Sequence, residues 1–433
     1  MAKQFTLRKV ILFLSAAGIC SYSYASGFQV WGLDAASIGN YHAERAAITE
    51  DASASYYNPA GLVAIKNQQF VAGIAPTMAD LRFRGTEAAN TLANSGPRPV
   101  SAQGGSFKLF PFGHYAAPIS DQFVFGLSAV EPFGFKTDYG NNTLLRYSST
   151  FNNLDVYDLS PALAIAFTDK FSLGFGLDCE RLTGEFDYST TALGQANDTV
   201  STNSGNNWAY GYHIGALYQF TPKTRVGISY QSQVVHRLSG TSKFVGVLAG
   251  SGGIFDTNVK MRMVLPPTTT ISAFHAFNAP WDIMGSLSLT QWTVTNSTVL
   301  NNVGGIQDGV LSNHLQVPLI QGYQNTWNWS VGTNYHVNEK ILFRAGVGYD
   351  QAPISSSNRD VKLPNANQVA VALGTHIQAT NTMGFDIGWT HIFAANARIN
   401  NYAQQAGDQI ATTNGTAYQD TDVYGLQMKW DIL

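Results

Sequence analysis

In the stretch Asn207-Trp-Ala-Tyr-Gly-Tyr-His-Ile-Gly-Ala-Leu-Tyr-Gln-Phe220, two kinds of side chain alternate. Every second residue from Trp208 to Phe220 is apolar or aromatic. The residues between them are mainly small or polar, such as Gly211, His213 and Gln219. Because successive side chains of a strand point to opposite faces, this alternation predicts a β-strand with one apolar face and one small or polar face.

The same alternation recurs along most of the chain. Clear examples are Phe171–Leu177, Trp281–Leu289, Ile341–Tyr349, Met383–Trp389 and Tyr424–Ile432. The second face of these segments carries Gly, Ser, Thr, Asn and isolated charges, which would make a poor dry core but a good lumen. The pattern therefore predicts an all-β membrane protein, in which the apolar faces of the strands meet lipid.

The connections between these segments alternate between short and long. The short ones are Pro118–Asp121, Thr168–Lys170, Thr221–Thr224, Asn278–Trp281, Val337–Lys340 and Ala379–Asn381. The long polar ones are Gly85–Gly104, Asp138–Ser149, Ser189–Asn206, Thr241–Phe255, Thr298–Gln324, Pro353–Asn365 and Asn400–Tyr418. Outer-membrane barrels have short periplasmic turns and long extracellular loops, so we expect an antiparallel barrel of about 14 strands. Its last strand runs from Tyr424 to the C-terminus and closes the barrel.

The composition agrees with a barrel and excludes other classes of protein. Only 12 % of the residues are charged although 45 % are hydrophobic, whereas soluble domains carry about 25 % charged residues. Beyond the N-terminus there is no run of about 18 apolar residues, so no membrane-spanning helix is expected. The net charge of −3 gives no basic patch and argues against a nucleic-acid partner.

The N-terminus reads as a secretory signal peptide over residues 1–25. A basic region with Lys3, Arg8 and Lys9 precedes the apolar stretch Val10–Ile19, and small residues follow at a suitable cleavage site. Export through the secretory pathway to a Gram-negative-type outer membrane is therefore expected. Only Cys179 remains after cleavage, so neither a disulfide nor a metal-thiolate site is expected, and no metal or cofactor is predicted.

Residues 26–66 lack the period of two and are rich in Ala, Gly and Ser. Such a compact segment before the first strand suits an N-terminal plug folded into the lumen, and residues 67–433 would then form the barrel. A disordered tail is the alternative. The plug ends in a corner at Asn58-Pro59-Ala60, because proline fixes φ and restricts the residue before it.

Several blocks follow one another in the order known from one transporter family. They are Ser26-Gly27-Phe28-Gln29, Asp51, Asn58-Pro59-Ala60, Ala116-Ala117-Pro118-Ile119-Ser120-Asp121-Gln122, Phe133-Gly134, Asn207-Trp208, Leu265-Pro266 and Asp350-x-x-Pro353 with Asn358-Arg359. Together they resemble the FadL-type outer-membrane long-chain fatty acid transporter family. The resemblance covers essentially the whole mature chain.

The resemblance implies passive diffusion of a long-chain fatty acid or another hydrophobic molecule through a plugged barrel, with lateral exit into the membrane. Pro132, Phe133 and Gly134 interrupt a strand and are expected to form the lateral opening. By the same resemblance, the corner Asn58, Pro59 and Ala60 touches this kink and gates it. An ordinary strand end is the alternative reading of the kink.

By the same resemblance, Gly27 and Phe28 are expected at the wall of the substrate pocket. Outer-membrane lipid and lipopolysaccharide would surround a monomeric barrel.

A buried carboxylate needs a cation or hydrogen-bond donors, and the lumenal basic residues of the family are not clearly present. Segment Thr183–Ser189 has no Lys or Arg, and Gln324 stands where a lysine would be sought. Arg262 and Arg344 are expected to face the lumen. Contact with the plug or the wall is the favoured interpretation of each, and substrate binding, together with Gln324, is the alternative. Neutral aromatic or aliphatic hydrocarbons therefore remain alternative substrates.

Other functions are weighed against transport of hydrophobic molecules. A general porin would need an open lumen and a charged constriction, which a plug opposes. An enzyme is not expected, because the histidines are scattered over several strands without a motif: His213, His275, His336, His376 and His391. The long loops could in addition serve as an adhesin or phage receptor.

Overall fold

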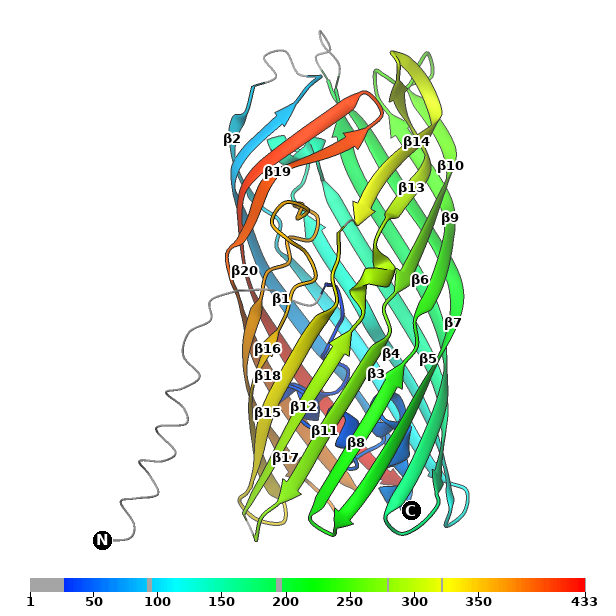
Figure 1. Cartoon of the computed structure of the whole chain (residues 1–433), viewed down its shortest axis with the longest axis vertical. Coiled ribbons are helices and arrows are strands. Elements are labelled where there is room, and N and C mark those ends of the chain that lie inside the picture. Colours follow the sequence, from blue (N-terminus) through cyan, green and yellow to red (C-terminus); the bar gives the residue numbers. More distant parts are fainter. Residues whose placement is uncertain (1–26, 92–95, 192–196, 279, 321, 433) are drawn as a thin grey trace, which may run out of the picture.

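The computed structural model describes residues 27–91, 96–191, 197–278, 280–320 and 322–432. The predicted signal peptide lies outside them. The described chain forms a tall barrel around a short N-terminal segment (Figure 1). Its strands are β1 (Gln68–Ala89), β2 (Arg98–Gln103), β3 (Ser106–Pro118), β4 (Phe123–Asp138), β5 (Phe151–Ala166), β6 (Phe171–Thr190), β7 (Thr199–Thr221), β8 (Thr224–Gln231), β9 (Val234–Val245), β10 (Ile254–Leu265), β11 (Thr268–Ala276), β12 (Trp281–Thr290), β13 (Thr298–Gln307), β14 (Val310–Ile320), β15 (Thr326–His336), β16 (Ile341–Asp350), β17 (Gln368–Gln378), β18 (Met383–Ala394), β19 (Ala397–Ala406) and β20 (Gln409–Ile432).

All pairings in the wall are antiparallel, and the wall is closed. Strand β1 pairs with β20 from Gln68 opposite Ile432 to Ala89 opposite Ala411. Several wall strands consist of two consecutive segments, such as β8 and β9, which both pair with β7. Counted in this way the barrel has 14 strands, which confirms the predicted fold class and number.

Alternate side chains of the wall strands point to the outer and the inner face of the barrel, as predicted. On β7, Trp208 and Tyr210 are 54 % and 74 % exposed on the outside, whereas the intervening His213 is 1 % exposed. Aromatic and aliphatic side chains thus cover the surface that meets lipid, and small or polar ones face inward.

The six predicted short turns all lie between strands, at one end of the barrel (Figure 1). Two predicted loops, Asp138–Ser149 and Pro353–Asn365, are irregular apart from a short 3-10 helix at Leu144–Tyr147. The prediction of loops at 298–324 and 400–418 was wrong, because most of the described residues there belong to two β-hairpins, β13–β14 and β19–β20. Beyond the membrane both faces of a strand can be polar, so the hydrogen-bond ladder continues without apolar alternation.

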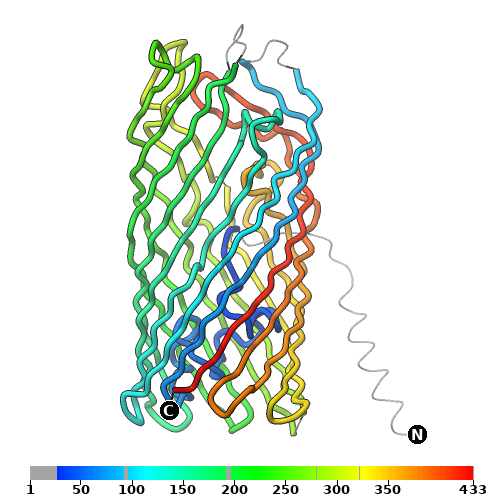
Figure 2. The backbone as a smooth tube through the Cα atoms, turned by 180° about the vertical axis from the view of Figure 1, so that it is seen from behind, coloured from blue at the N-terminus to red at the C-terminus, as the bar shows by residue number. Residues whose placement is uncertain are grey.

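The N-terminal segment lies inside the barrel, towards the end with the short turns (Figure 2). It contains α2 (Ala35–Ile38), η1 (Arg45–Ala47), α3 (Ala54–Tyr57) and η2 (Pro59–Ala64), all largely buried. Its backbone comes very close to the wall, since a Cβ atom on Gly346 would lie 2.1 Å from the Asn40 carbonyl oxygen. No helix of the described residues is long and apolar enough to cross a membrane.

Polar contacts also fix this segment to the wall. Arg225 of β8 pairs with Glu44, with Nη2 3.0 Å from Oε2. Burial, followed by the nearby carboxylate of Glu50, raises the pKa of Glu44 to about 8. His213 contacts the Ser55 carbonyl oxygen through Nε2 at 2.9 Å. The segment is therefore anchored by buried polar groups as well as by packing.

Candidate functional site

The wall is interrupted between β3 and β4. These strands pair only from Pro118 opposite Val124 to Gly113 opposite Ala129. Strand β4 continues along β5, with a register shift between Val130 and Phe133. This is where Pro132 removes a backbone donor and the strand bulges.

The interruption is bounded at both ends. Towards the long loops, the Ser106 hydroxyl donates to the Lys136 carbonyl at 2.8 Å, and the Asp138 amide donates to the Gly104 carbonyl at 3.2 Å. The stretch of β3 from Ser106 to Phe112 pairs with β1 but not with β4, and it is roughly 20 Å long at the usual rise per residue. We call this stretch of wall the β3–β4 gap.

The start of the N-terminal segment lies against the kink in β4. The Val30 amide donates to the Pro132 carbonyl at 2.8 Å, and the Gly134 amide donates to the Phe28 carbonyl at 3.0 Å. Gln29 and Phe133 form an isolated β-bridge. Residues 28–30 thus provide backbone hydrogen-bond partners for the kinked part of β4, which β3 does not provide.

The corner Asn58-Pro59-Ala60 lies elsewhere, so the expectation that it touches Phe133-Gly134 was wrong. The Asn58 side-chain amide donates to the carbonyls of Ala216 on β7 and Ile228 on β8, at 3.2 and 3.4 Å. The glycines of β6 and β7 explain this position, because a Cβ atom on Gly174 would lie 2.3 Å from the Ala60 nitrogen, and one on Gly215 would lie 1.8 Å from Asn58 Oδ1.

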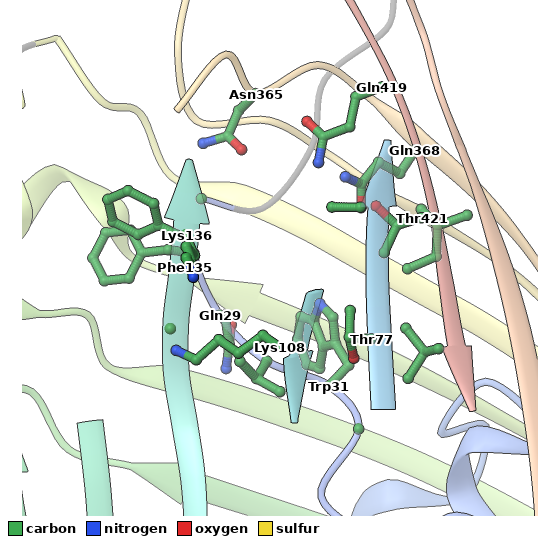
Figure 3. A pocket seen from close by; sticks show the side chains of 18 of the residues that line it. Gln29, Trp31, Thr77, Lys108, Phe135, Lys136, Asn365, Gln368, Gln419 and Thr421 are labelled. Carbon is green, nitrogen blue, oxygen red and sulfur yellow. The ribbon is translucent and has the colours of Figure 1, made fainter. Parts of the chain in front are cut away.

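A cavity lies directly behind the β3–β4 gap (Figure 3). Its empty volume, opening included, is about 1200 Å³. Apolar side chains from the N-terminal segment, β3, β4, the loop before β17 and β18 line much of it, namely Phe28, Val30, Phe110, Phe135, Leu363 and Ile392. An apolar cavity and the interruption of the wall thus lie next to each other.

Phe28 is the centre of an aromatic cluster at this cavity. It is 3 % exposed, and its ring centroid lies 5.0 Å from that of Trp292, 5.8 Å from that of Phe133 and 6.1 Å from that of Phe135. Gly27 also lines the cavity, with φ of +53°, and a Cβ atom there would lie 2.4 Å from the Trp292 ring. Both residues predicted at the pocket wall are therefore at the cavity, where they pack against Trp292.

A family model described as "Outer membrane protein transport protein (OMPP1/FadL/TodX)" matches residues 16–431. The chain belongs to this family. The long-chain fatty acid transport protein of Salmonella typhi is 22 % identical over 92 % of this chain and 95 % of its own length. Outer membrane protein P1 of Haemophilus influenzae (strain ATCC 51907 / DSM 11121 / KW20 / Rd) is 24 % identical over 98 % of both chains.

Solved structures agree on the fold. A Pseudomonas aeruginosa FadL homologue superposes with a TM-score of 0.82 at 22 % identity, covering 94 % of this chain and 100 % of that one. The Ralstonia pickettii toluene transporter TbuX gives a TM-score of 0.65 at 18 % identity, over 93 % and 100 %. This FadL/TodX-family chain is thus an outer-membrane transport protein of Gram-negative type.

Three polar residues that the sequence suggested as substrate contacts, Arg262, Gln324 and Arg344, lie away from the cavity of this FadL/TodX-family barrel. Arg262 is exposed on the outer face, opposite Arg237. The prediction that it faces the lumen was wrong, because Pro266 and Pro267 separate β10 from β11 and shift the alternation between them. Gln324 is exposed, and its amide donates to the Pro353 carbonyl at 2.7 Å.

Arg344 faces inward as expected but is already paired. Its guanidinium lies 2.6 Å from Asp386 and 3.3 Å from Glu50 of the N-terminal segment. This cluster lies beside the short turn after β15, away from the cavity behind the gap. Arg344 thus fixes the N-terminal segment to the wall.

Two lysines that line the cavity, Lys108 of β3 and Lys136 of β4, were missed from the sequence. The side chain of Lys136 points outward, because Lys136 pairs with Asn153 on β5 and its Nζ lies over the Phe151 ring. Lys108 interrupts the apolar run from Phe107 to Phe112, and this could have served as a signal. Nothing in the sequence pattern marked Trp292. Among the described residues no group of three or more His, Cys, Asp or Glu side chains is arranged to hold a metal ion.

Proposed function

We propose that this protein lets long-chain fatty acids diffuse from the outside into the cavity and then sideways through the β3–β4 gap into the membrane. The observation that carries this proposal is the coincidence of an apolar cavity with an interruption of the wall. No chemical reaction is involved. The barrel acts as a monomer, surrounded by outer-membrane lipid and lipopolysaccharide.

A lateral exit suits a hydrophobic substrate. Each buried CH₂ group is worth about 0.8 kcal/mol, so a long acyl chain loses many kcal/mol if it leaves an apolar pocket for water. A path from the cavity through the wall into lipid avoids that loss. A general porin is less suitable, because the N-terminal segment occupies the lumen (Figure 2).

Residues 28–30 would act as the gate in this mechanism. They close the kink with two backbone hydrogen bonds and one side chain, Phe28. Each hydrogen bond is worth only about 0.5–1.5 kcal/mol net, so thermal motion or an entering substrate can displace the segment. Asn58-Pro59-Ala60 would serve as the fixed anchor of a plug that spans residues 26–66.

Neutral hydrocarbons are the second candidate substrates. The aromatic cluster of Phe28, Phe133 and Trp292 favours them, and TbuX is named as a toluene transporter. The ammonium group of Lys108 at the cavity favours a fatty acid, which is the substrate in the name of the Salmonella typhi relative.

Competitive uptake tests this proposal. Cells that lack their own transporter of this family would express the full chain and receive radiolabelled oleate, with or without excess toluene. We expect oleate uptake above that of cells with an empty vector, and weak competition by toluene. Strong competition would favour the hydrocarbon alternative, and uptake equal to the empty vector would refute the proposal.

A further inference from the structure

Two arginines lie directly opposite each other on the outer face of the wall. Arg237 of β9 pairs in register with Arg262 of β10, and both side chains are exposed. Like charges directly opposite each other in a sheet are destabilising. Among the described residues no carboxylate lies within ion-pair distance of either guanidinium group. An anion bound between the two arginines would remove their repulsion.

A third arginine lies at the same level of the wall. Arg181 of β6 pairs in register with Trp208 of β7, and its guanidinium carbon lies 5.5 Å from the centre of the Trp208 ring. Strands β7 and β9 pair with Asn206 opposite Ser239. Trp208 and Arg237 each lie two residues from that pair, towards the short turns. The outer face thus carries a row of cations across β6, β7, β9 and β10 (Figure 1), which we call the arginine row: Arg181, Arg237 and Arg262.

The arginine row lies at the extracellular edge of the apolar band. On β7 the outward side chains from Trp208 to Phe220 are apolar or aromatic, whereas those nearer the long loops are Asn206, Ser204 and Thr202. From Trp208 to Phe220 the strand spans roughly 30 Å of height at the usual rise and tilt, which matches the thickness of the hydrocarbon core. Because Trp and Tyr gather at membrane interfaces and long loops are extracellular, the row faces the head groups of the outer leaflet.

The charges around the arginine row leave it positive. Lys260 lies two residues from Arg262 on the same face of β10 and is exposed. The carboxylates on the outer faces of β6 and β10 lie farther towards the long loops, namely Glu185, Asp187 and Asp256. On the neighbouring strand β5, Asp155 is already paired with Lys108, with Oδ1 2.6 Å from Nζ. An anionic head group at the level of the row therefore meets unpaired cations.

We propose that the arginine row binds the phosphate groups of lipopolysaccharide in the outer leaflet. Arginine suits this ligand, because its planar guanidinium group binds phosphate through two parallel hydrogen bonds. A lipopolysaccharide molecule carries several separate anionic groups at the membrane surface, whereas a typical phospholipid carries a single phosphate. A row of cations across four strands therefore fits lipopolysaccharide. The site lies on the outside of the barrel, so this inference goes beyond the proposed function and holds for any transported substrate.

Binding of purified lipopolysaccharide tests the site. The protein, purified in detergent and washed free of lipopolysaccharide, is titrated with labelled deep-rough lipopolysaccharide that is either intact or enzymatically dephosphorylated. We expect Arg237→Gln/Arg262→Gln to bind the intact form roughly tenfold more weakly, the loss for two exposed charge pairs near the upper end of their usual strength. Binding of the dephosphorylated form should not change. Arg82→Gln is the matched control, because Arg82 is also exposed on the outer face but pairs with Asp80 within the wall.

Thermal stability, followed by heat-dependent gel mobility, provides a second readout. Without lipopolysaccharide the double variant should melt no lower than the wild type, because it lacks the repulsion between like charges. With lipopolysaccharide the wild type should be stabilised more than the variant.

Equal binding of intact lipopolysaccharide by the wild type and the double variant would overturn the inference. An equal loss for the dephosphorylated form would also overturn it. Wild-type binding of phosphatidylglycerol as tight as that of lipopolysaccharide would do the same, because the row would then be a general surface for anionic lipid. Oleate uptake tests the proposed function separately, so the two failures are distinguishable.

Discussion

Replacing Phe28 by alanine should release the N-terminal segment from the kink in β4. The Phe28 ring is 3 % exposed and packs on Phe133, Phe135 and Trp292. Truncating a buried Phe to Ala costs about 3–5 kcal/mol. If about 3 kcal/mol of this cost is lost from the free energy that docks the N-terminal segment, the fraction of molecules with the segment undocked rises roughly 100-fold.

Thiol labelling measures this fraction. A cysteine is introduced at Gln29, with Cys179 replaced by serine so that the mature chain carries a single thiol. The rate of reaction with a water-soluble maleimide then reports how often residue 29 leaves its bridge with Phe133. Phe28→Leu, which keeps an apolar side chain, is the matched control and should give a smaller increase. Equal labelling rates with and without the Phe28→Ala substitution would refute the view that Phe28 holds the gate.

Three further predictions concern the anchors of the N-terminal segment and the outer wall. Arg344→Met leaves the buried carboxylate of Asp386 without its guanidinium partner. The free energy of unfolding should therefore fall by about 3–5 kcal/mol. Urea unfolding followed by gel mobility measures this change. The pKa of Glu44 is raised to about 8 in the docked segment. The contribution of the Glu44 carboxyl group to the free energy of docking is therefore complete below pH ~4.5 and is lost as the pH rises through about 8. Thiol labelling at residue 29 should therefore accelerate over that range, and Glu44→Gln should weaken this dependence; a dependence of the same size in the variant would contradict the assignment. Arg262→Met should leave oleate uptake unchanged, because Arg262 lies on the outer face, and a large loss would place it on the substrate path.

The parts of the fold that depend on local pattern were predictable from the sequence. The alternation of apolar and polar residues is repeated in most of the spanning strands, and turn residues mark the short connections, so the approximate strand number and the closure of the barrel followed from the sequence. The long polar hairpins were missed, because a ladder outside the membrane needs no apolar face. Pro266-Pro267 shifted the alternation between β10 and β11, which a simple count of residues from Arg262 could not detect.

The site was less predictable, because it depends on contacts between segments far apart in the chain. Phe28 and Phe133 were both identified, but the position of Asn58 depended on which wall glycines it would meet. Trp292 and Lys108 come from parts of the chain that have no motif, and they reach the site only through the register of the barrel.

The lateral route is tested most directly by blocking the β3–β4 gap. A Cβ atom on Gly134 would lie 2.6 Å from Lys108 Nζ and 2.7 Å from Glu131 Oε1, so a phenylalanine there projects into the gap. The control is Gly285→Phe on β12, where the nearest atom is the Ser330 carbonyl oxygen at 3.4 Å. With both barrels shown to assemble by heat-dependent gel mobility, Gly134→Phe should reduce the initial rate of oleate uptake to that of cells without the protein, while Gly285→Phe keeps the wild-type rate. Wild-type uptake by Gly134→Phe would contradict exit through this gap.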